Sequence, residues 1–397
     1  MNNEARSMKY EVRIGSIATV MYVLGVVLLF LYSFTQIDLN LTLSSSHILY
    51  EIQRVFQRIG YFQRPLSTIL YVSVMALLLT TYWILFIVSQ KKKITEKTAW
   101  LLVGISAGVL LFSYPGFSYD IFNYLFDARI VTLYQENPYV HKALDYLQDP
   151  WINIMRWTHR TYPYGPGWLV LTVPLSVAGF QKFVVTLYLF KALMVGCYLA
   201  SVLAIKHIME KINPGYVVPA ILLFALNPLI ITESLVSAHN DIVMMALSLW
   251  SFYFLVSKRK AWSLVFLLFS ISIKFATVFL IPAYVYVFWL MQSKKKVLWE
   301  YVILTTIAGM TLAVAAATIR TQFQPWYLLY VLPFAALLPQ RVSIVIPVVI
   351  ISIAGMLQYV PFLYTGKWDP PIPTILNVIM ASGVIISLLV VAVRWRS

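Results

Sequence analysis

Four polar residues of the stretch SYDIFNYLFDAR have the spacing of one helix face. Asp120, Asn123, Tyr124 and Asp127 stand at positions i, i+3, i+4 and i+7, which share one side of an α-helix. A partly desolvated aspartate has a raised pKa and can accept a proton from a hydroxyl group near neutral pH. The pattern therefore predicts a general base at Asp120 with a second carboxylate two turns away. A solvated polar face of an interfacial helix fits the same spacing about equally well.

These residues belong to a polar segment, residues 116–166, which is unusual in so apolar a chain. Five of the 15 acidic residues lie in it, namely Asp120, Asp127, Glu136, Asp145 and Asp149. Two rigid aromatic turns, NPY at 137–139 and YPYGP at 162–166, are suited to line a pocket for a sugar or a lipid headgroup. The candidate pocket residues are Asn123, Tyr124, Asn137, Tyr139, Tyr162 and Tyr164. Tyrosines also gather at membrane interfaces without a ligand, so each turn alone is a weak signal.

Polar side chains also stand at the ends of later apolar runs. His239, Asn240 and Asp241 follow one another at such a boundary, where they either cap a helix or bind a charged headgroup. Lys274 lies between two short apolar runs, and Lys191 lies within a long one. Ionisable residues in apolar runs mark functional sites, although the long side chain of Lys191 also allows it to reach the nearer surface.

A turn further along the chain holds Arg320 and the sequence QPWY, which adds Trp326 and Tyr327 to the candidate pocket residues. The candidate carboxylates lie in the first half of the chain and the candidate cations later, which predicts separate roles for the two groups. The carboxylate would activate a hydroxyl group, and the cations would hold an anionic leaving group such as a phosphate. The sequence has no Walker loop, no dinucleotide-binding glycine fingerprint and no zinc-binding pattern, so a nucleotide-sugar site of the soluble kind is not supported.

The elements that position these residues are membrane helices. The chain is 60% hydrophobic and 11% charged, outside the range of soluble domains. Apolar runs of about 18–23 residues predict an all-α, polytopic transmembrane bundle of about 12–13 helices. The net charge of +15 comes from basic clusters between the runs. Such clusters are typical of the cytoplasmic side of a membrane protein, so a nucleic-acid partner is not expected. A single cysteine, Cys197, excludes an intrachain disulfide.

The basic clusters also predict the topology. A basic N-terminal segment with Arg6, Lys9 and Arg13 precedes the first span, and Lys91–Lys93 follow the second. The runs expected to form membrane helices are 14–35, 66–89, 98–114, 167–180, 183–205, 216–232, 240–257, 261–273, 275–291, 297–319, 327–339, 342–360 and 374–393. With the clusters in the cytoplasm, including Lys206 and Arg394/Arg396, residues 116–166 lie outside. Two runs separate this segment from Lys206, where an odd number of crossings is needed. Either 167–180 enters and leaves on one face, or the weak cluster of Lys206 and Lys211 is external. We expect the first, because this run is short and contains Pro174 and Gly179.

Two amphipathic segments are expected to lie in the plane of the membrane. In residues 44–64 the apolar residues Ile48, Leu49, Ile52, Val55, Phe56 and Ile59 recur at helical spacing opposite Glu51, Arg54 and Arg58. In the stretch that carries Asp120, the apolar side consists of Ile121, Phe122, Leu125 and Phe126. We expect this side to face the membrane interface.

The motifs, in this order, resemble the GT-C superfamily of integral-membrane glycosyltransferases. The resemblance rests on SYDIFNYLFDAR, ENPY and TYPYGP, followed by NP, AHNDIVMMALSLWSFYFL, IKFATVFLIPAY and QPWYLLYVLP. It extends from about Ser118 to about Pro333 and is strongest to prokaryotic mannosyltransferases that use polyprenyl-phosphate sugars. It implies one membrane domain with N-terminal spans at 1–115, a catalytic external loop at 116–166, conserved helices at 167–340 and variable spans at 341–397.

The resemblance also implies roles for single residues. Asp120 stands at the position of the catalytic base, and Asp127 and Arg129 match a D-G-R-like continuation in which Ala128 replaces the usual glycine. Tyr162 matches a tyrosine–proline motif, with Tyr164 in place of a second proline. The remaining matches are the family's His-Asn-Asp motif at His239, Asn240 and Asp241, and its downstream lysine at Lys274.

The implied function is inverting transfer of a hexose, with mannose favoured, from a polyprenyl- or dolichyl-phosphate sugar to an extracytoplasmic glycan, glycolipid or protein at the plasma membrane. Asp120 would deprotonate the acceptor, and Asp127 would position the acceptor or raise the pKa of Asp120. The residues expected to bind the donor are Arg129, His239, Asn240, Asp241, Lys274 and Arg320. No cofactor is predicted, although the carboxylates leave room for a divalent metal.

Two other functions stay open at this point. A transporter or flippase of a lipid-linked sugar would also need cations and aromatic residues around a cavity, but transporters often show an internal repeat, and none is evident. A polysaccharide polymerase or ligase would share the donor type. We would expect it to have more external arginines than residues 116–166 contain.

Overall fold

The computed structural model describes residues 3–396 of the chain. The side chains of residues 3–10 and 394–396 lie outside the description, and with them the predicted anchors Arg6, Lys9, Arg394 and Arg396. The described residues form α-helices linked by short 3-10 and π turns, with one isolated β-bridge between Lys142 and Thr161. The all-helical bundle predicted from the sequence is confirmed.

Helix lengths separate the spans from the helices that only fill the bundle. The helices are α1 (Asn3–Ser33), α2 (His47–Gln57), α3 (Arg64–Gln90), α4 (Glu96–Leu111), α5 (Asp120–Thr132), α6 (Pro166–Ala178), α7 (Phe183–Ile212), α8 (Val217–Ala225), α9 (Pro228–Ile231), α10 (Asp241–Val256), α11 (Lys260–Ile273), α12 (Ile281–Gln292), α13 (Trp299–Thr321), α14 (Leu332–Ala335), α15 (Val342–Leu357), α16 (Val360–Thr365) and α17 (Ile372–Arg396). By length and composition, seven helical segments of the described chain can cross a membrane, or eight if the bent pair Pro214–Ala225 and Pro228–Val236 is one span. The chain is therefore a multi-pass membrane protein.

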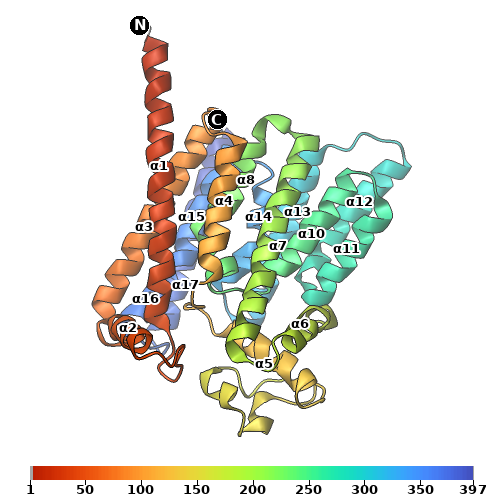
Figure 1. The fold of residues 1–397 in the computed structure, drawn as a ribbon. Helices are drawn as coiled ribbons and strands as arrows, with labels where there is room; N and C mark the ends of the chain where they lie inside the picture. The colour runs from red at the N-terminus through yellow and green to blue at the C-terminus, as the bar shows by residue number, and fades with distance from the viewer. Residues whose placement is uncertain (1–2, 397) are drawn as a thin grey trace.

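The helices run between two ends of different character (Figure 1). The loops 91–95, 213–216, 257–259, 293–298 and 339–341 lie at the upper end in Figure 1, which we call the basic end. Ion pairs in or beside these loops join Lys91 to Glu11, Lys206 to Glu96 and Arg341 to Glu300. The opposite end, here called the site end, carries residues 34–63, 112–182 and 366–371. The prediction that the basic clusters share one side is confirmed for the described side chains.

Helix α6 begins and ends at the site end. Its 13 residues span about 20 Å, less than the thickness of the hydrocarbon core. Gly165, just before its first residue, donates its N–H to the carbonyl of Ile273, and Ser176 near its end contacts Thr132 of α5 at 2.9 Å. Figure 1 shows α6 across the lower end beside α5, with α7 rising from there. Both ends of α6 thus lie at one end of the bundle, which is the arrangement expected of a segment that enters and leaves on one face.

The two amphipathic segments have different surroundings. In α2, Ile48 and Val55 are exposed while Gln53 and Gln57 are buried against the protein, so its apolar side faces outward, as expected for a helix in the membrane plane. In α5 the four apolar residues Ile121, Phe122, Leu125 and Phe126 are buried in the protein core. The expectation that they face the membrane interface is wrong, because α6 and α7 cover this side of the helix.

Candidate active site

Asp120 is the first residue of α5 and lies where three parts of the chain meet. Its Oδ1 accepts a hydrogen bond from the indole N–H of Trp157 at 3.2 Å. Its Oδ2 lies 3.5 Å from Nδ1 of His239, which enters from the far side of the bundle. The side chain of Asp120 is 16% exposed, so the carboxylate is largely shielded and still open on one side. An aspartate in this setting can exchange a proton with a bound hydroxyl group.

His239 is a fully buried imidazole between two carboxylates. Its Nδ1 faces Asp120, and its Nε2 lies 3.4 Å from Oε2 of Glu233, whose side chain is also fully buried. The hydroxyl of Tyr359 donates to Oε1 of Glu233 at 2.7 Å. The ring of Trp326 stacks on the imidazole with centroids 4.0 Å apart, which fixes the plane of the ring. Tyr359, Glu233, His239 and Asp120 thus lie in a row, in which the contact from Tyr359 to Glu233 is a hydrogen bond and the two contacts of His239 are longer charge contacts.

A break in a span places Glu233 and His239 inside the bundle. Asn227 precedes Pro228, which disfavours helical backbone in the residue before it, and the Asn227 side chain caps the next helix by accepting from the N–H of Leu229. The two halves of the span differ in direction by 53°. A π turn, Thr232–Val236, then carries Glu233, and Ala238 has a φ of 58°, a strained value for alanine. The backbone is thus held in an uncommon shape beside the site.

A second acid–base pair lies between α10 and the start of the 3-10 turn Phe275–Leu280. Nζ of Lys274 is 2.7 Å from Oδ1 of the fully buried Asp241, and it lies 5.5 Å from the ring centre of Tyr164. Glycine is required at position 165 because a Cβ there would lie 2.1 Å from the carbonyl oxygen of Ser272. This close approach joins the YPYGP turn to the end of α11 and brings Tyr164 to Lys274.

Amide and phenol groups connect the Asp120–His239 pair to the Asp241–Lys274 pair. The hydroxyl of Tyr124 donates to Oδ1 of Asn240 at 3.4 Å, and its ring packs edge-on against those of Tyr164 and Trp168. Asn123, one residue earlier in α5, is partly buried. Two members of the predicted face of α5, Asp120 and Tyr124, therefore contact His239 and Asn240 of the site.

Unpartnered polar atoms are concentrated at this site. Among the described side chains, more than half of the buried N and O atoms that lack a hydrogen-bond partner belong to residues 232–241. They include Oδ2 of Asp241 and Nδ2 of Asn240, and Oδ1 of Asn123 is a further one nearby. Buried polar groups in proteins nearly always have a partner, and each exception needs an explanation. A polar substrate that enters the site would provide the partners.

The two aspartates of α5 have different pKa values. Burial opposes ionisation of Asp120, but the interactions with His239, Lys274 and Trp157 outweigh it and lower the pKa of Asp120 below its ordinary value. Burial and the charge of Asp120 raise the pKa of Asp127 to about 8. The expectation of a raised pKa at Asp120 is therefore wrong, because cationic and N–H groups surround it. The raised value belongs to Asp127, which has no such partners.

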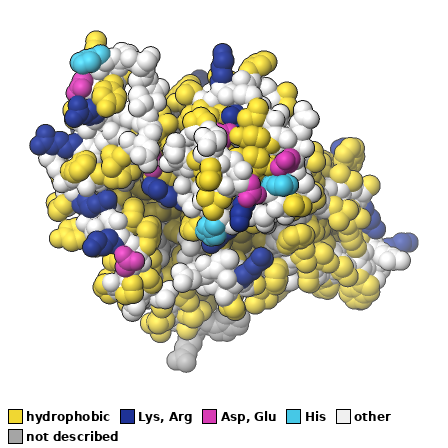
Figure 2. Space-filling view, turned by 90° about the horizontal axis from the view of Figure 1, so that it is seen from below, with side chains coloured by type: hydrophobic (Ala, Val, Ile, Leu, Met, Phe, Trp, Pro, Cys, Tyr) yellow, Lys and Arg dark blue, Asp and Glu magenta, His cyan; other side chains and the backbone are white. Residues whose placement is uncertain are grey.

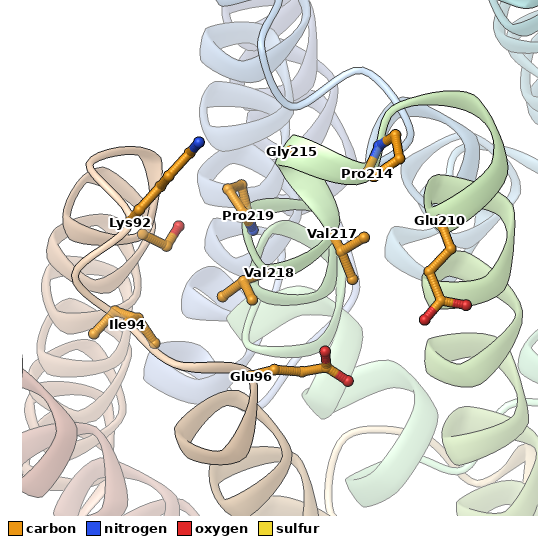
Figure 3. A pocket seen from close by; sticks show the side chains of 10 residues that line it. Lys92, Ile94, Glu96, Glu210, Pro214, Gly215, Val217, Val218 and Pro219 are labelled. Carbon is orange, nitrogen blue, oxygen red and sulfur yellow. The ribbon is translucent and has the colours of Figure 1, made fainter.

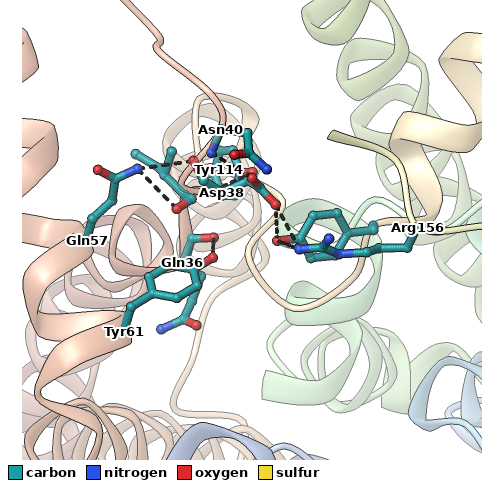
Figure 4. A network of polar contacts seen from close by, with 9 residues as sticks. Gln36, Asp38, Asn40, Gln57, Tyr61, Tyr114 and Arg156 are labelled. Atoms are coloured by element: carbon teal, nitrogen blue, oxygen red, sulfur yellow. Dashed lines mark hydrogen bonds and ion pairs between the residues drawn. The ribbon is translucent and has the colours of Figure 1, made fainter. Parts of the chain in front are cut away.

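A polar network fastens the start of α5 to the loop after α1 (Figure 4). Oδ2 of the buried Asp38 accepts hydrogen bonds from Arg156 at 2.9 Å and from the hydroxyl of Tyr119 at 2.8 Å. Asp38 in turn donates its backbone N–H to the hydroxyl of Tyr114. Since Tyr119 directly precedes Asp120, this network fixes the position of the Asp120 carboxylate.

The surface of the site end is mixed in character. Seen from below, basic, acidic and histidine side chains are spread over this end among apolar ones (Figure 2).

Several predicted site residues have other partners. The guanidinium of Arg129 binds Asp149 and Gln181, each at 2.6 Å, and stacks on Trp151, so it joins residues 116–166 to the turn before α7. Lys191 is buried and donates to the carbonyl and hydroxyl of Ser113, just after α4, where its N–H groups satisfy a carbonyl left free at the end of the helix. Arg129 and Lys191 thus hold the scaffold of the site.

The aromatic turns mainly support one another. Asn137 accepts the N–H of Tyr139 in a local turn, and the hydroxyl of Tyr139 donates to the carbonyl of Tyr164 at 3.0 Å. The hydroxyl of Tyr162 donates to the carbonyl of Gly165. Of these residues, only Tyr164 reaches Lys274.

The end of α13 borders the site. Arg320 is exposed there, and Tyr327, whose ring packs edge-on against Trp326, contacts Thr321 at 2.6 Å.

Four residues of the site were not predicted from the sequence: Trp157, Glu233, Tyr359 and Asp38. Glu233 was detectable as the only acidic residue in the apolar run 216–232 and its continuation to 236. In the described chain no three His, Cys, Asp or Glu residues are grouped so that they could hold a metal ion.

Comparison with known proteins identifies a family. A family model described as alpha-(1->6)-mannopyranosyltransferase, N-terminal domain, matches residues 15–291, more than two thirds of the chain. No curated protein and no solved structure matches. The match confirms the resemblance to mannosyltransferases that the motifs indicated. Asp120, Glu233, His239 and Lys274 lie within the matched region, whereas Trp326 and Tyr359, which complete the site, lie beyond it.

Proposed function

Because the chain belongs to the alpha-(1->6)-mannopyranosyltransferase family, we propose that it transfers mannose from a polyprenyl-phosphate sugar to an acceptor hydroxyl with inversion at the anomeric carbon. The observation that carries this proposal is the shielded carboxylate of Asp120, within reach of His239 and Trp157. A carboxylate of this kind is suited to general-base work on a hydroxyl group held against it.

In the proposed step, Asp120 removes the proton of the acceptor hydroxyl as its oxygen attacks the anomeric carbon of mannose. The bond between this carbon and the phosphate oxygen breaks on the opposite face, and polyprenyl phosphate leaves with one more negative charge. Lys274, His239 and Arg320 are the cationic or N–H groups that would stabilise this charge. The low pKa of Asp120 keeps it ionised at neutral pH and therefore ready to accept the proton.

Asp127 has the complementary role. With a pKa of about 8, raised by burial and by Asp120, its carboxyl group carries a proton at neutral pH. It can then donate a hydrogen bond to the acceptor or to the sugar. Pairs of carboxyl groups whose surroundings separate their pKa values commonly divide the roles of base and proton-bearing partner.

We further propose that the site faces the outside of the plasma membrane. The basic end carries the lysine and arginine clusters, which favour the cytoplasm, and the site end lies opposite. A lipid-linked donor fits this arrangement because its headgroup would lie at the membrane surface beside α2, whose apolar side faces outward. Such a location makes a cell-envelope glycan, glycolipid or exported protein the acceptor.

The linkage in the family's description allows a sharper proposal. Transfer to a 6-hydroxyl group with an α product requires, by inversion, a donor in which mannose is β-linked to phosphate. The product of a reaction with a β-linked mannosyl phosphate is therefore expected to have the α configuration, measurable from the one-bond carbon–hydrogen coupling of the new anomeric carbon. A β product would exclude inversion.

The experiment that tests the base is Asp120→Asn in membranes supplied with a radiolabelled mannosyl-phosphate polyprenol and an acceptor sugar. Loss of the base is expected to lower kcat by roughly 10²–10⁴-fold with little change in donor binding. Glu136→Gln is the matched control, since Glu136 lies in the same segment, is exposed and contacts Tyr146 rather than the site. Near wild-type transfer by the Asp120→Asn protein would remove the proposal.

A further inference from the structure

The buried carboxylate of Glu233 needs an explanation beyond folding. It lies in a broken span among apolar residues, its side chain is fully buried, and no lysine or arginine pairs with it among the described residues. Its Oε2 faces only Nε2 of His239, at 3.4 Å. A buried carboxylate is unfavourable unless a charge and hydrogen bonds compensate for its desolvation. Among the described side chains, His239 is the group positioned to provide the positive charge.

We infer that Glu233 is a positioning residue for the base: it holds His239 through Nε2, in its charged form, so that Nδ1 stays directed at Asp120. This inference rests on the proposed role of Asp120. From Tyr359 to Asp120, each contact fixes the next side chain. Tyr359 holds Glu233 at 2.7 Å, Trp326 fixes the ring plane of His239, and the backbone N–H of His239 donates to the carbonyl of Glu233 at 3.0 Å.

The charges around the imidazole favour its charged form. Two carboxylates, Asp120 and Glu233, face its two nitrogens, whereas the third carboxylate nearby, Asp241, is paired with Lys274. A neutral imidazole would donate to only one carboxylate and leave the other unpaired. A charged one donates to both. The contacts of 3.4 and 3.5 Å are long for hydrogen bonds, and such contacts commonly shorten when the substrate binds.

The function of this arrangement is to keep Asp120 ionised. A positive charge next to a carboxylate stabilises the form that has lost its proton, so the base stays available at lower pH. Without Glu233 the imidazole would lose its second acceptor and with it the reason to stay charged. Asp120 would then take up a proton at higher pH, and the acidic limb of the pH–rate profile would move upward.

The arrangement also gives the last part of the chain a role at the site. Tyr359 lies between α15 and α16, and Trp326 precedes α14, so both lie beyond the region matched by the family model. Tyr71 of α3 packs edge-on against Tyr359, with ring centroids 6.4 Å apart. Three distant segments thus contribute aromatic residues around the Glu233–His239 pair.

The test is the pH dependence of mannosyl transfer by Glu233→Gln, which keeps the shape and removes the charge. We expect kcat to fall by at least about tenfold, with the KM for the donor within about threefold of the wild type. The acidic limb of the kcat profile should move upward by about one pH unit. Glu233→Asp, which keeps the charge, should restore part of the rate and the original limb. A purely structural role would lower the amount of folded protein without moving this limb.

Two further variants keep the test decisive. Tyr359→Phe removes the hydroxyl that holds Glu233 and should move the limb in the same direction by a smaller amount, and it stands in if Glu233→Gln does not fold. An unmoved limb in every variant that folds would overturn the inference. Asp120→Asn is measured in parallel: an inactive Asp120→Asn protein with an unmoved limb in Glu233→Gln rejects this inference alone, whereas an active Asp120→Asn protein rejects the proposed function.

Discussion

Both ends of the bundle contain acid–base pairs, and the pairs differ in their contact with water. At the basic end, Lys206 lies 2.5 Å from Glu96 and 3.6 Å from Glu210, and all three side chains are partly exposed. Glu96 and Glu210 border an open cavity of about 350 Å³ between α3, α7 and α8 (Figure 3). At the site end, Glu233, His239 and Asp241 are fully buried. The charges at the basic end are solvated, and those at the site end are not.

This difference separates anchoring from chemistry. An exposed ion pair contributes roughly 0–1 kcal/mol to stability, and its charges cost little to maintain. A buried pair has a desolvation cost of several kcal/mol per ion, which its own attraction barely offsets. The site end also retains unpartnered polar atoms in residues 232–241. Buried charges with incomplete partners are expected where a polar substrate binds, and solvated pairs are expected where lysines anchor a protein to a membrane surface.

The largest effect should come from breaking the buried Lys274–Asp241 pair. Lys274→Met leaves Asp241 buried without its cation, and we expect a loss of roughly 3–5 kcal/mol in the free energy of unfolding. The midpoint of thermal unfolding of the protein in detergent measures this loss. The double variant Lys274→Met/Asp241→Asn should regain most of the stability without regaining transfer. An unchanged midpoint in Lys274→Met would show that the pair is solvated after all.

The second effect is a change of pH dependence at Asp127. Its pKa of about 8 is raised by burial and by Asp120, so the protonated form is present below pH 8 and is lost as the pH rises. If the proton is needed, the wild-type rate should fall about tenfold between pH 8 and pH 9–9.5. Asp127→Asn keeps an N–H donor and should remove this alkaline limb. Glu96→Gln, at the basic end, is the matched control and should leave the limb in place.

Part of the contrast between the solvated basic end and the buried site end could be predicted from the sequence. The spacing of the residues on α5, the basic clusters and the apolar runs can be recognised over short stretches of sequence. They are enough to predict helix faces and which loops share one end of the bundle. For the same reason the apolar side of α2 was predicted correctly. The apolar side of α5 was not, because the same pattern serves a membrane interface and a protein core, and only the packing of α6 and α7 decides between them.

The electrostatics of the site could not be predicted, because they depend on residues far apart in sequence. The lowered pKa of Asp120 results from His239, Lys274 and Trp157, none of which lies within 30 residues of it. Glu233 becomes a site residue only because the chain bends by 53° after Asn227. Arg129 has the residue type of a phosphate ligand, yet it is bound to Asp149 and Gln181. Residue type indicates what a side chain is able to do, and its neighbours decide whether it does so.

A smaller effect is expected at the partly exposed network that holds α5. Arg156→Gln removes one of the partners of the buried Asp38 carboxylate but leaves the hydroxyl of Tyr119 and the N–H of Asn40. We expect kcat to fall by about threefold, since a small displacement of Asp120 misaligns the proton transfer. Initial rates at saturating donor measure this change. The control is Lys367→Gln, an exposed lysine at the same end, and an equal effect in both variants would contradict a role of the network.

The smallest effect should come from the basic end itself. Lys206→Gln removes the cation between Glu96 and Glu210, but water solvates both carboxylates, so the free energy of unfolding should change by less than about 1 kcal/mol. In a protein of this size such a change moves the unfolding midpoint by only about 1–2 °C. The transfer rate and its pH profile should match those of the wild type. A tenfold loss of transfer would mean that the basic end is coupled to the site through α7, the helix that carries both Lys206 and Lys191. The contrast between a solvated anchor and a buried site would then no longer hold.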